Sequence, residues 1–96
     1  MTRFVYSPEA AHGLEQLVDF LLQHDVTAAI KTIDIITDAI ALLTQHPLIG
    51  RPVEHGLREL VISRGKTGYL ALYEFDEPHD VVIVLAVRHQ REQDYH

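Results

Sequence analysis

Three arginines at predicted strand ends in the second half of the chain could bind an acidic or anionic partner. Arg58 opens one run of strand-forming residues, and Arg88 and Arg91 follow the last such run. In an antiparallel meander these strand ends can lie on one edge of the sheet, which would gather the guanidinium groups into a basic patch. The alternative is structural, with Arg58 paired to Glu59 or Glu92 and the other two arginines solvated. The sequence keeps both interpretations open.

The overall charge argues against a nucleic-acid-binding surface. The 96 residues include 8 Lys and Arg and 14 Asp and Glu, for a formal net charge of −6. Attraction to the phosphate backbone requires clustered basic residues, so we expect no direct sequence-specific binding of nucleic acid. Residues 1–49 hold two basic residues against six acidic ones. Any anion-binding surface must therefore come from the second half of the chain.

The residue types and spacing favour neither a metal site nor a cofactor site. The seven histidines include no pair at i and i+4, and the chain has no Cys. Gly65 and Gly68 lack the spacing of a phosphate-binding loop. There is no N-terminal apolar signal segment, and no apolar run approaches the about 20 residues that a membrane span needs. We expect a cytoplasmic protein with no membrane partner, in one domain over residues 1–96.

Two helices are predicted in the first half of the chain. The first begins at Pro8 behind an N-cap at Ser7 and ends near His24. Asp25 can cap a second helix, which ends at His46-Pro47. The apolar residues follow helical spacing, at Leu14, Leu17, Val18, Leu21 and Leu22 in the first helix and at Ile30, Ile33, Ile36, Ile40 and Leu43 in the second.

The second helix carries a further apolar stripe beside the first one. Ile35, Ala39 and Leu42 make the helix apolar around more than half its circumference, which is wider than a surface helix needs. The stripe is therefore either buried in the chain's own core or covered by a partner.

Short strands are predicted around and after the helices. A first strand contains Phe4 and Tyr6, and three more strands cover residues 57–63, 69–75 and 81–87. The last of these is apolar on both faces, which places it inside the sheet and not at an edge. Pro and Gly make residues 47–52 a loop, and hairpin-length connections join the last three strands as an antiparallel meander. The predicted class is α+β with the order βααβββ.

The ordered set of segments resembles the ParE/RelE superfamily of toxins from bacterial type II toxin–antitoxin modules. The segments that carry the resemblance are the two helices, His46-Pro47-Leu48-Ile49-Gly50-Arg51, Leu57-Arg58-Glu59-Leu60, Gly68-Tyr69-Leu70-Ala71-Leu72-Tyr73 and Ala86-Val87-Arg88-His89-Gln90-Arg91-Glu92. The resemblance implies two N-terminal helices packed on an antiparallel sheet and a cognate antitoxin that wraps the toxin. It also implies one of two mechanisms: RelE-like members cut messenger RNA in the ribosome, and ParE-like members poison DNA gyrase.

The ribonuclease alternative requires cationic groups around the scissile phosphate, with an acid and a base. In RelE-like toxins a Gly-Tyr-Arg motif supplies a phosphate-binding arginine, and in this chain Leu70 stands at that place. Alignment through Arg91 and Tyr95 puts His89 where the family has a second catalytic arginine. If the chain were a nuclease, its catalytic residues would be His89, Arg91 and Tyr95.

The ParE-like interpretation fits the chain better because Leu70 and the acidic total remove cations that RNA cleavage needs. It implies no catalytic residues, a target-binding patch at Arg58, Arg88 and Arg91, and DNA gyrase as the target. The antitoxin would then cover the stripe of Ile35, Ala39 and Leu42. A third alternative is a degenerate relative that binds an antitoxin but is not toxic.

Overall fold

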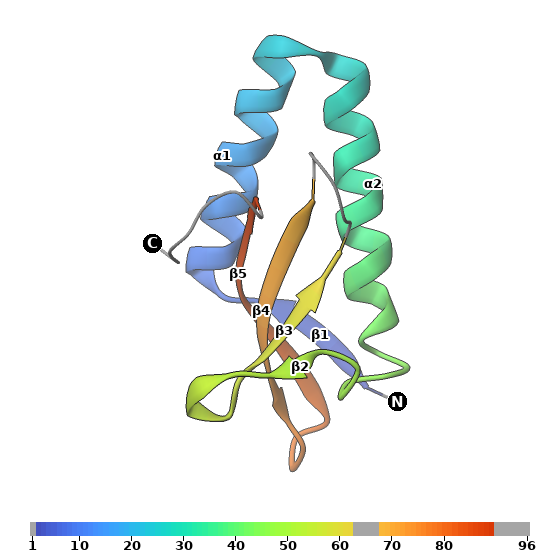
Figure 1. The fold of residues 1–96 in the computed structure, drawn as a ribbon, viewed down its shortest axis with the longest axis vertical. Coiled ribbons are helices and arrows are strands. Elements are labelled where there is room, and N and C mark those ends of the chain that lie inside the picture. Colours follow the sequence, from blue (N-terminus) through green and yellow to red (C-terminus); the bar gives the residue numbers. More distant parts are fainter. Residues whose placement is uncertain (1, 63–67, 90–96) are drawn as a thin grey trace.

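The computed structural model describes residues 2–62 and 68–89 as two helices packed on a five-stranded sheet (Figure 1). The elements along the chain are β1 (Arg3–Tyr6), α1 (Pro8–His24), α2 (Val26–Leu42), β2 (Arg51–Pro52), the short 3-10 helix η1 (Glu54–Gly56), β3 (Arg58–Val61), β4 (Tyr69–Asp76) and β5 (Val81–His89). The predicted α+β class is confirmed, with one additional short strand.

Both helices begin at the predicted residues because polar side chains cap them. The Ser7 hydroxyl accepts a hydrogen bond from the Ala10 N–H at 3.0 Å, and the Asp25 carboxylate accepts one from the Ala28 N–H at 3.1 Å. The backbone N–H of Asp25 also donates to the Leu21 carbonyl at 2.7 Å, which caps the end of α1. One residue therefore ends one 17-residue helix and begins the next.

Helix α2 ends earlier than predicted, at Leu42 instead of next to Pro47. The N–H groups of Gln45 and His46 both donate to the Leu42 carbonyl, at 3.1 and 3.0 Å. These bonds satisfy the carbonyl in tight turns, so the chain leaves the helix before the proline that would have stopped it.

The sheet has the order β1-β5-β4-β3-β2. Strands β3, β4 and β5 form the predicted antiparallel meander, and β5 lies between β1 and β4, as its apolar sequence predicted. The expectation of a fully antiparallel sheet was wrong in one pairing, because β1 runs parallel to β5. Residues 51–52, predicted as loop, form β2 and pair with the start of β3.

The core lies between the helices and one face of the sheet. Its buried residues come from both helices, β4 and β5, namely Ala10, Ile36, Ile40, Leu43, Tyr69, Tyr73, Val82 and Val84. Ile30 was predicted on the same face as Ile36 but is 55% exposed. Figure 1 shows the reason: the connection between α1 and α2 extends beyond the strands, so the start of α2 has no sheet to cover it.

Candidate functional site

The second apolar stripe of α2 lies outside the core of the described chain. Ile35 is 47% exposed, Leu42 is 41% exposed, and Ala39 between them is half-buried. The adjacent face of the same helix carries Ile36 and Ile40, which are fully buried. The core therefore uses one apolar face of α2 and leaves the second one accessible, as a partner-binding surface requires.

The loop that follows α2 is fixed to the sheet by Tyr73. The Tyr73 hydroxyl donates to the Pro47 carbonyl and accepts from the Gly50 N–H, both at 2.8 Å. The Tyr73 side chain is fully buried. Its pKa is raised by burial, while the Gly50 hydrogen bond and the Arg58 charge act in the opposite direction. A single buried phenol thus holds both ends of the loop.

Arg58 reinforces the same loop from β3. One of its terminal nitrogens donates to the Leu48 carbonyl at 3.1 Å and to the Gly50 carbonyl at 2.8 Å. No sequence pattern shows which side chain will donate to a loop carbonyl, so Sequence analysis did not predict these two hydrogen bonds. These bonds differ from the structural alternative of Sequence analysis, in which Arg58 pairs with Glu59 or Glu92. Glu92 lies outside the described residues.

Glu59 pairs instead with Arg51, across the short β2–β3 ladder. Two guanidinium nitrogens of Arg51 donate to one oxygen of Glu59, at 2.7 and 3.1 Å. Glu59 is 8% exposed, whereas the Arg51 side chain is largely in solvent. The acid is buried on the face of the sheet opposite Arg58, because side chains alternate along β3.

The predicted basic patch is not formed by Arg58 and Arg88. Strands β3 and β5 are both antiparallel to β4 and therefore run in the same direction. Arg58 lies at the start of β3, pairs with Tyr73 and faces the core side of the sheet. Arg88 lies near the end of β5, pairs with Leu70 and faces the opposite side. Only strands that are immediate neighbours and antiparallel bring a start next to an end, and β4 separates β3 from β5. Arg91 lies outside the described residues.

Of the candidate nuclease residues, His89 lies within the described part of the chain, and it faces away from the position of Leu70. His89 pairs with Tyr69, and their rings meet edge to face with centroids 5.4 Å apart on the core side. Leu70, next in sequence to Tyr69, points to the opposite face and lies between Val61 and Arg88 on its neighbouring strands. Tyr95, like Arg91, lies outside the described residues.

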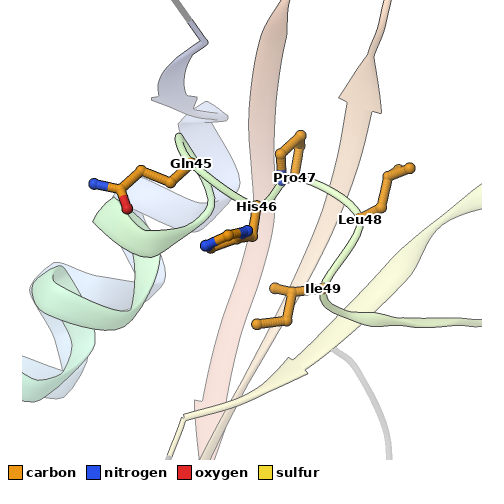
Figure 2. Close-up of a pocket in the computed structure, with 5 residues that line it drawn as sticks. All are labelled: Gln45, His46, Pro47, Leu48 and Ile49. Carbon is orange, nitrogen blue, oxygen red and sulfur yellow. The ribbon is translucent and has the colours of Figure 1, made fainter.

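Sequence analysis gave no binding role to the loop formed by His46, Pro47, Leu48 and Ile49. With Gln45 these residues line an open hollow of about 470 Å³ (Figure 2). Leu48 is 59% exposed and Ile49 is 51% exposed. The signal present in the sequence was a pair of large apolar residues, Leu48 and Ile49, in a loop between two prolines.

Among residues 2–62 and 68–89, no group of three or more His, Cys, Asp or Glu side chains could hold a metal ion. The helices in that part of the chain are too short or too polar to cross a membrane.

Comparison with known proteins gives consistent matches over nearly the whole chain. The family described as the ParE toxin of the type II toxin–antitoxin system parDE matches residues 4–94. Toxin RelE3 of Caulobacter vibrioides is 34% identical over 86 residues, which cover 90% of this chain and 91% of that protein.

Two solved structures share the fold. One is the chromosomal ParDE toxin–antitoxin system from P. aeruginosa, with a TM-score of 0.71, 19% identity and coverage of 93% of this chain and 95% of that one. The other is the toxin–antitoxin complex RelBE2 from Mycobacterium tuberculosis, with a TM-score of 0.60, 22% identity and coverage of 93% and 98%. The chain thus belongs to the ParE toxin family of type II toxin–antitoxin systems, within the ParE/RelE superfamily.

Proposed function

We propose that this toxin acts in the cytoplasm by binding DNA gyrase directly, without catalysing a reaction itself, and that a cognate antitoxin neutralises it. The family match supports a toxin, and the chemistry of one sheet position supports this mode of action. That position is Leu70.

Leu70 carries the proposal because an apolar side chain offers a phosphate no charge or hydrogen bond. RNA cleavage needs stabilisation of a dianionic phosphorus centre, for which cations at fixed places supply the largest contribution. Leu70 also faces away from His89, the described candidate for proton transfer. A phosphate held at the Leu70 position would therefore lie across the sheet from that imidazole.

The antitoxin would cover the exposed stripe of Ile35, Ala39 and Leu42. An apolar strip along a helix is the surface that an amphipathic segment of a partner protein covers. Both structural relatives are toxin–antitoxin systems, and one is described as a complex. Co-expression with the protein encoded beside this chain, followed by size-exclusion chromatography, tests this point. Two proteins that elute separately at micromolar concentration would refute antitoxin binding.

The target is tested by inducing the toxin and following DNA and messenger RNA in parallel. We expect SOS induction and filamentation in cells, and inhibition of supercoiling or trapped cleaved DNA when purified toxin is added to gyrase. Ribosome-bound messenger RNA should stay intact. New cuts at A-site codons within minutes of induction, with supercoiling unaffected, would transfer the assignment to the ribonuclease.

The ribonuclease is the second candidate because of two specific observations. Arg88 lies directly across from Leu70 on the same face of the sheet, so that face contains a cation near the missing arginine. The relative from Caulobacter vibrioides carries a RelE name. In this alternative His89, Arg91 and Tyr95 would be the catalytic residues. A chain that binds its antitoxin but affects neither supercoiling nor messenger RNA would be the degenerate relative.

A further inference from the structure

The loop after α2 presents apolar side chains at fixed positions in solvent. Hydrogen bonds from Tyr73 and Arg58 hold its backbone, while Leu48 and Ile49 remain more than half exposed. In Figure 2 the His46 ring and the Ile49 side chain extend toward the same side of the loop. A rigid exposed apolar loop loses little conformational entropy when a partner binds, which favours recognition.

This loop continues the exposed stripe of α2. The His46 N–H donates to the Leu42 carbonyl at 3.0 Å, which is the spacing of one more helical turn. This bond places His46 directly after the end of the stripe, where the lining of the hollow begins. Stripe and hollow are therefore adjacent along the chain, and together they make up the candidate surface from Ile35 to Ile49.

The C-terminal half of α2 beside this surface is acidic. Asp34 and Asp38 are both exposed, and the basic residue of the helix, Lys31, lies about two turns before Asp38. The loop end of the surface differs, because Arg58 donates to the Leu48 and Gly50 carbonyls there. Asp38 lies three residues after Ile35 and four before Leu42, at the edge of the stripe, and no basic residue occupies the last turn of α2. The carbonyl end of a helix adds negative potential at the same place.

We infer that a basic amphipathic segment of the cognate antitoxin occupies this surface. Its apolar residues contact Ile35 and Leu42, one of them enters the hollow beside Ile49, and a Lys or Arg lies next to Asp38. The inference rests on the proposed function, since it gives the chemistry of the partner segment that neutralises the toxin. An acidic tail would meet like charges along α2, which opposes binding.

Charge reversal at two positions tests the inference with the co-purified antitoxin as the probe. Asp38→Lys changes the edge of the stripe, and Glu74→Lys makes the same change of net charge at an exposed residue of β4, on the face of the sheet opposite the core. Calorimetric titration should give a dissociation constant raised at least about tenfold by Asp38→Lys and changed less than about threefold by Glu74→Lys. Added salt should weaken binding to the wild type more than to Asp38→Lys.

The hollow is tested by a second matched pair. Ile49→Ser places a polar group in the hollow, and Val61→Ser makes a similar change at a residue that is 40% exposed on the opposite face of the sheet. Ile49→Ser should weaken antitoxin binding about tenfold or more, and Val61→Ser should leave it unchanged. Circular dichroism of each variant confirms that the fold is retained.

The outcomes separate the two proposals. Absence of any complex with the wild type refutes antitoxin binding and the inference together. A complex that forms but responds equally to Asp38→Lys and Glu74→Lys, or becomes tighter with Asp38→Lys, leaves the proposed function intact and overturns the basic segment. Equal effects of Ile49→Ser and Val61→Ser would remove the hollow from the interface.

Discussion

At the scale of single residues, Tyr73 connects the core to the exposed loop. Its ring fills the centre of the core, and its hydroxyl reaches both the Pro47 carbonyl and the Gly50 N–H. A buried hydroxyl with two partners contributes to stability mainly because its removal leaves buried polar groups unsatisfied. The ring and the hydroxyl can therefore be separated by mutation.

Tyr73→Phe keeps the ring and removes the hydroxyl. We expect the free energy of unfolding to fall by about 1–3 kcal/mol, because two backbone groups lose a hydrogen bond in a buried place. Urea denaturation followed by circular dichroism measures the change. An unchanged midpoint and slope would show that water replaces the hydroxyl without cost.

Alkaline pH should destabilise the protein through the half-buried Tyr6 and the fully buried Tyr73. Burial raises the pKa of Tyr6 and is the largest cause of the raised pKa of Tyr73. Below about pH 10 both phenols are protonated in the folded and unfolded states, so this contribution to stability is complete. Above that pH the unfolded chain releases its protons first, and the free energy of unfolding falls as the pH rises. Urea denaturation between about pH 9 and 11 should show a shallower fall for Tyr73→Phe than for the wild type; parallel curves would contradict the assignment.

At the scale of elements, glycines at two positions have opposite roles. A Cβ on Gly50 would lie 2.6 and 2.7 Å from atoms of the Tyr73 ring and hydroxyl and 3.0 Å from the Glu59 carbonyl oxygen. A Cβ on Gly13, inside α1, would have no heavy atom within 4 Å. The loop therefore requires a glycine, whereas the helix does not.

Replacement of each glycine by alanine tests this contrast. Gly50→Ala should lower the free energy of unfolding by about 1–3 kcal/mol through overpacking. Gly13→Ala should raise it by about 0.5–1 kcal/mol, because alanine loses less backbone entropy in a helix. Thermal denaturation of the two variants beside the wild type gives both signs. A stabilised Gly50→Ala variant would mean that the loop moves away from Tyr73.

The elements show which features a sequence can predict. Local signals at Ser7 and Asp25 predicted the helix starts, and the apolar run at residues 81–87 predicted an interior strand. The parallel pairing of β1 with β5 joins segments 78 residues apart, which no local pattern encodes. The two-residue β2 is too short to give a pattern of its own and is defined by its pairing with β3. The exposure of Ile35 depends on which apolar face the sheet covers, and the partner of Arg58 is a pair of loop carbonyls, so neither could be deduced from spacing.

At the scale of the whole molecule, two of the three arginines proposed for one patch have different surroundings. Arg58 is bonded to the loop that carries Leu48, on the core side of the sheet, and Arg88 is half-buried on the other face. If Arg58 contacts the target, its mutation would therefore weaken target binding and also release the loop that it holds. Arg91 remains a proposed target-binding residue that follows the last described strand.

Stability and toxicity measured on the same variants distinguish these roles. Arg58→Ala should lower the free energy of unfolding by about 1–3 kcal/mol, since two charge-assisted hydrogen bonds are lost. Arg91→Ala should lower it by well under about 1 kcal/mol and weaken target binding by about 1–3 kcal/mol. We expect the Arg91→Ala protein to fold, to bind antitoxin and to be non-toxic. A fully toxic or unfolded Arg91→Ala protein would remove Arg91 from the target-binding surface.

The parallel pairing of β1 with β5 also determines when the nascent chain can fold. Arg3 pairs with Val81, and the Ser7 side chain that caps α1 also donates to the Leu85 carbonyl, 78 residues further along the chain. Translation proceeds from the N-terminus, so β1 and the start of α1 lack their partners until residues 81–85 have left the ribosome. Such distant pairing is slow to form, and the sheet closes only after its interior strand has been made. Chains that end before β5 lack the strand that joins β1 to the rest of the sheet, so we expect a stalled or truncated translation product to be unable to adopt the toxin fold.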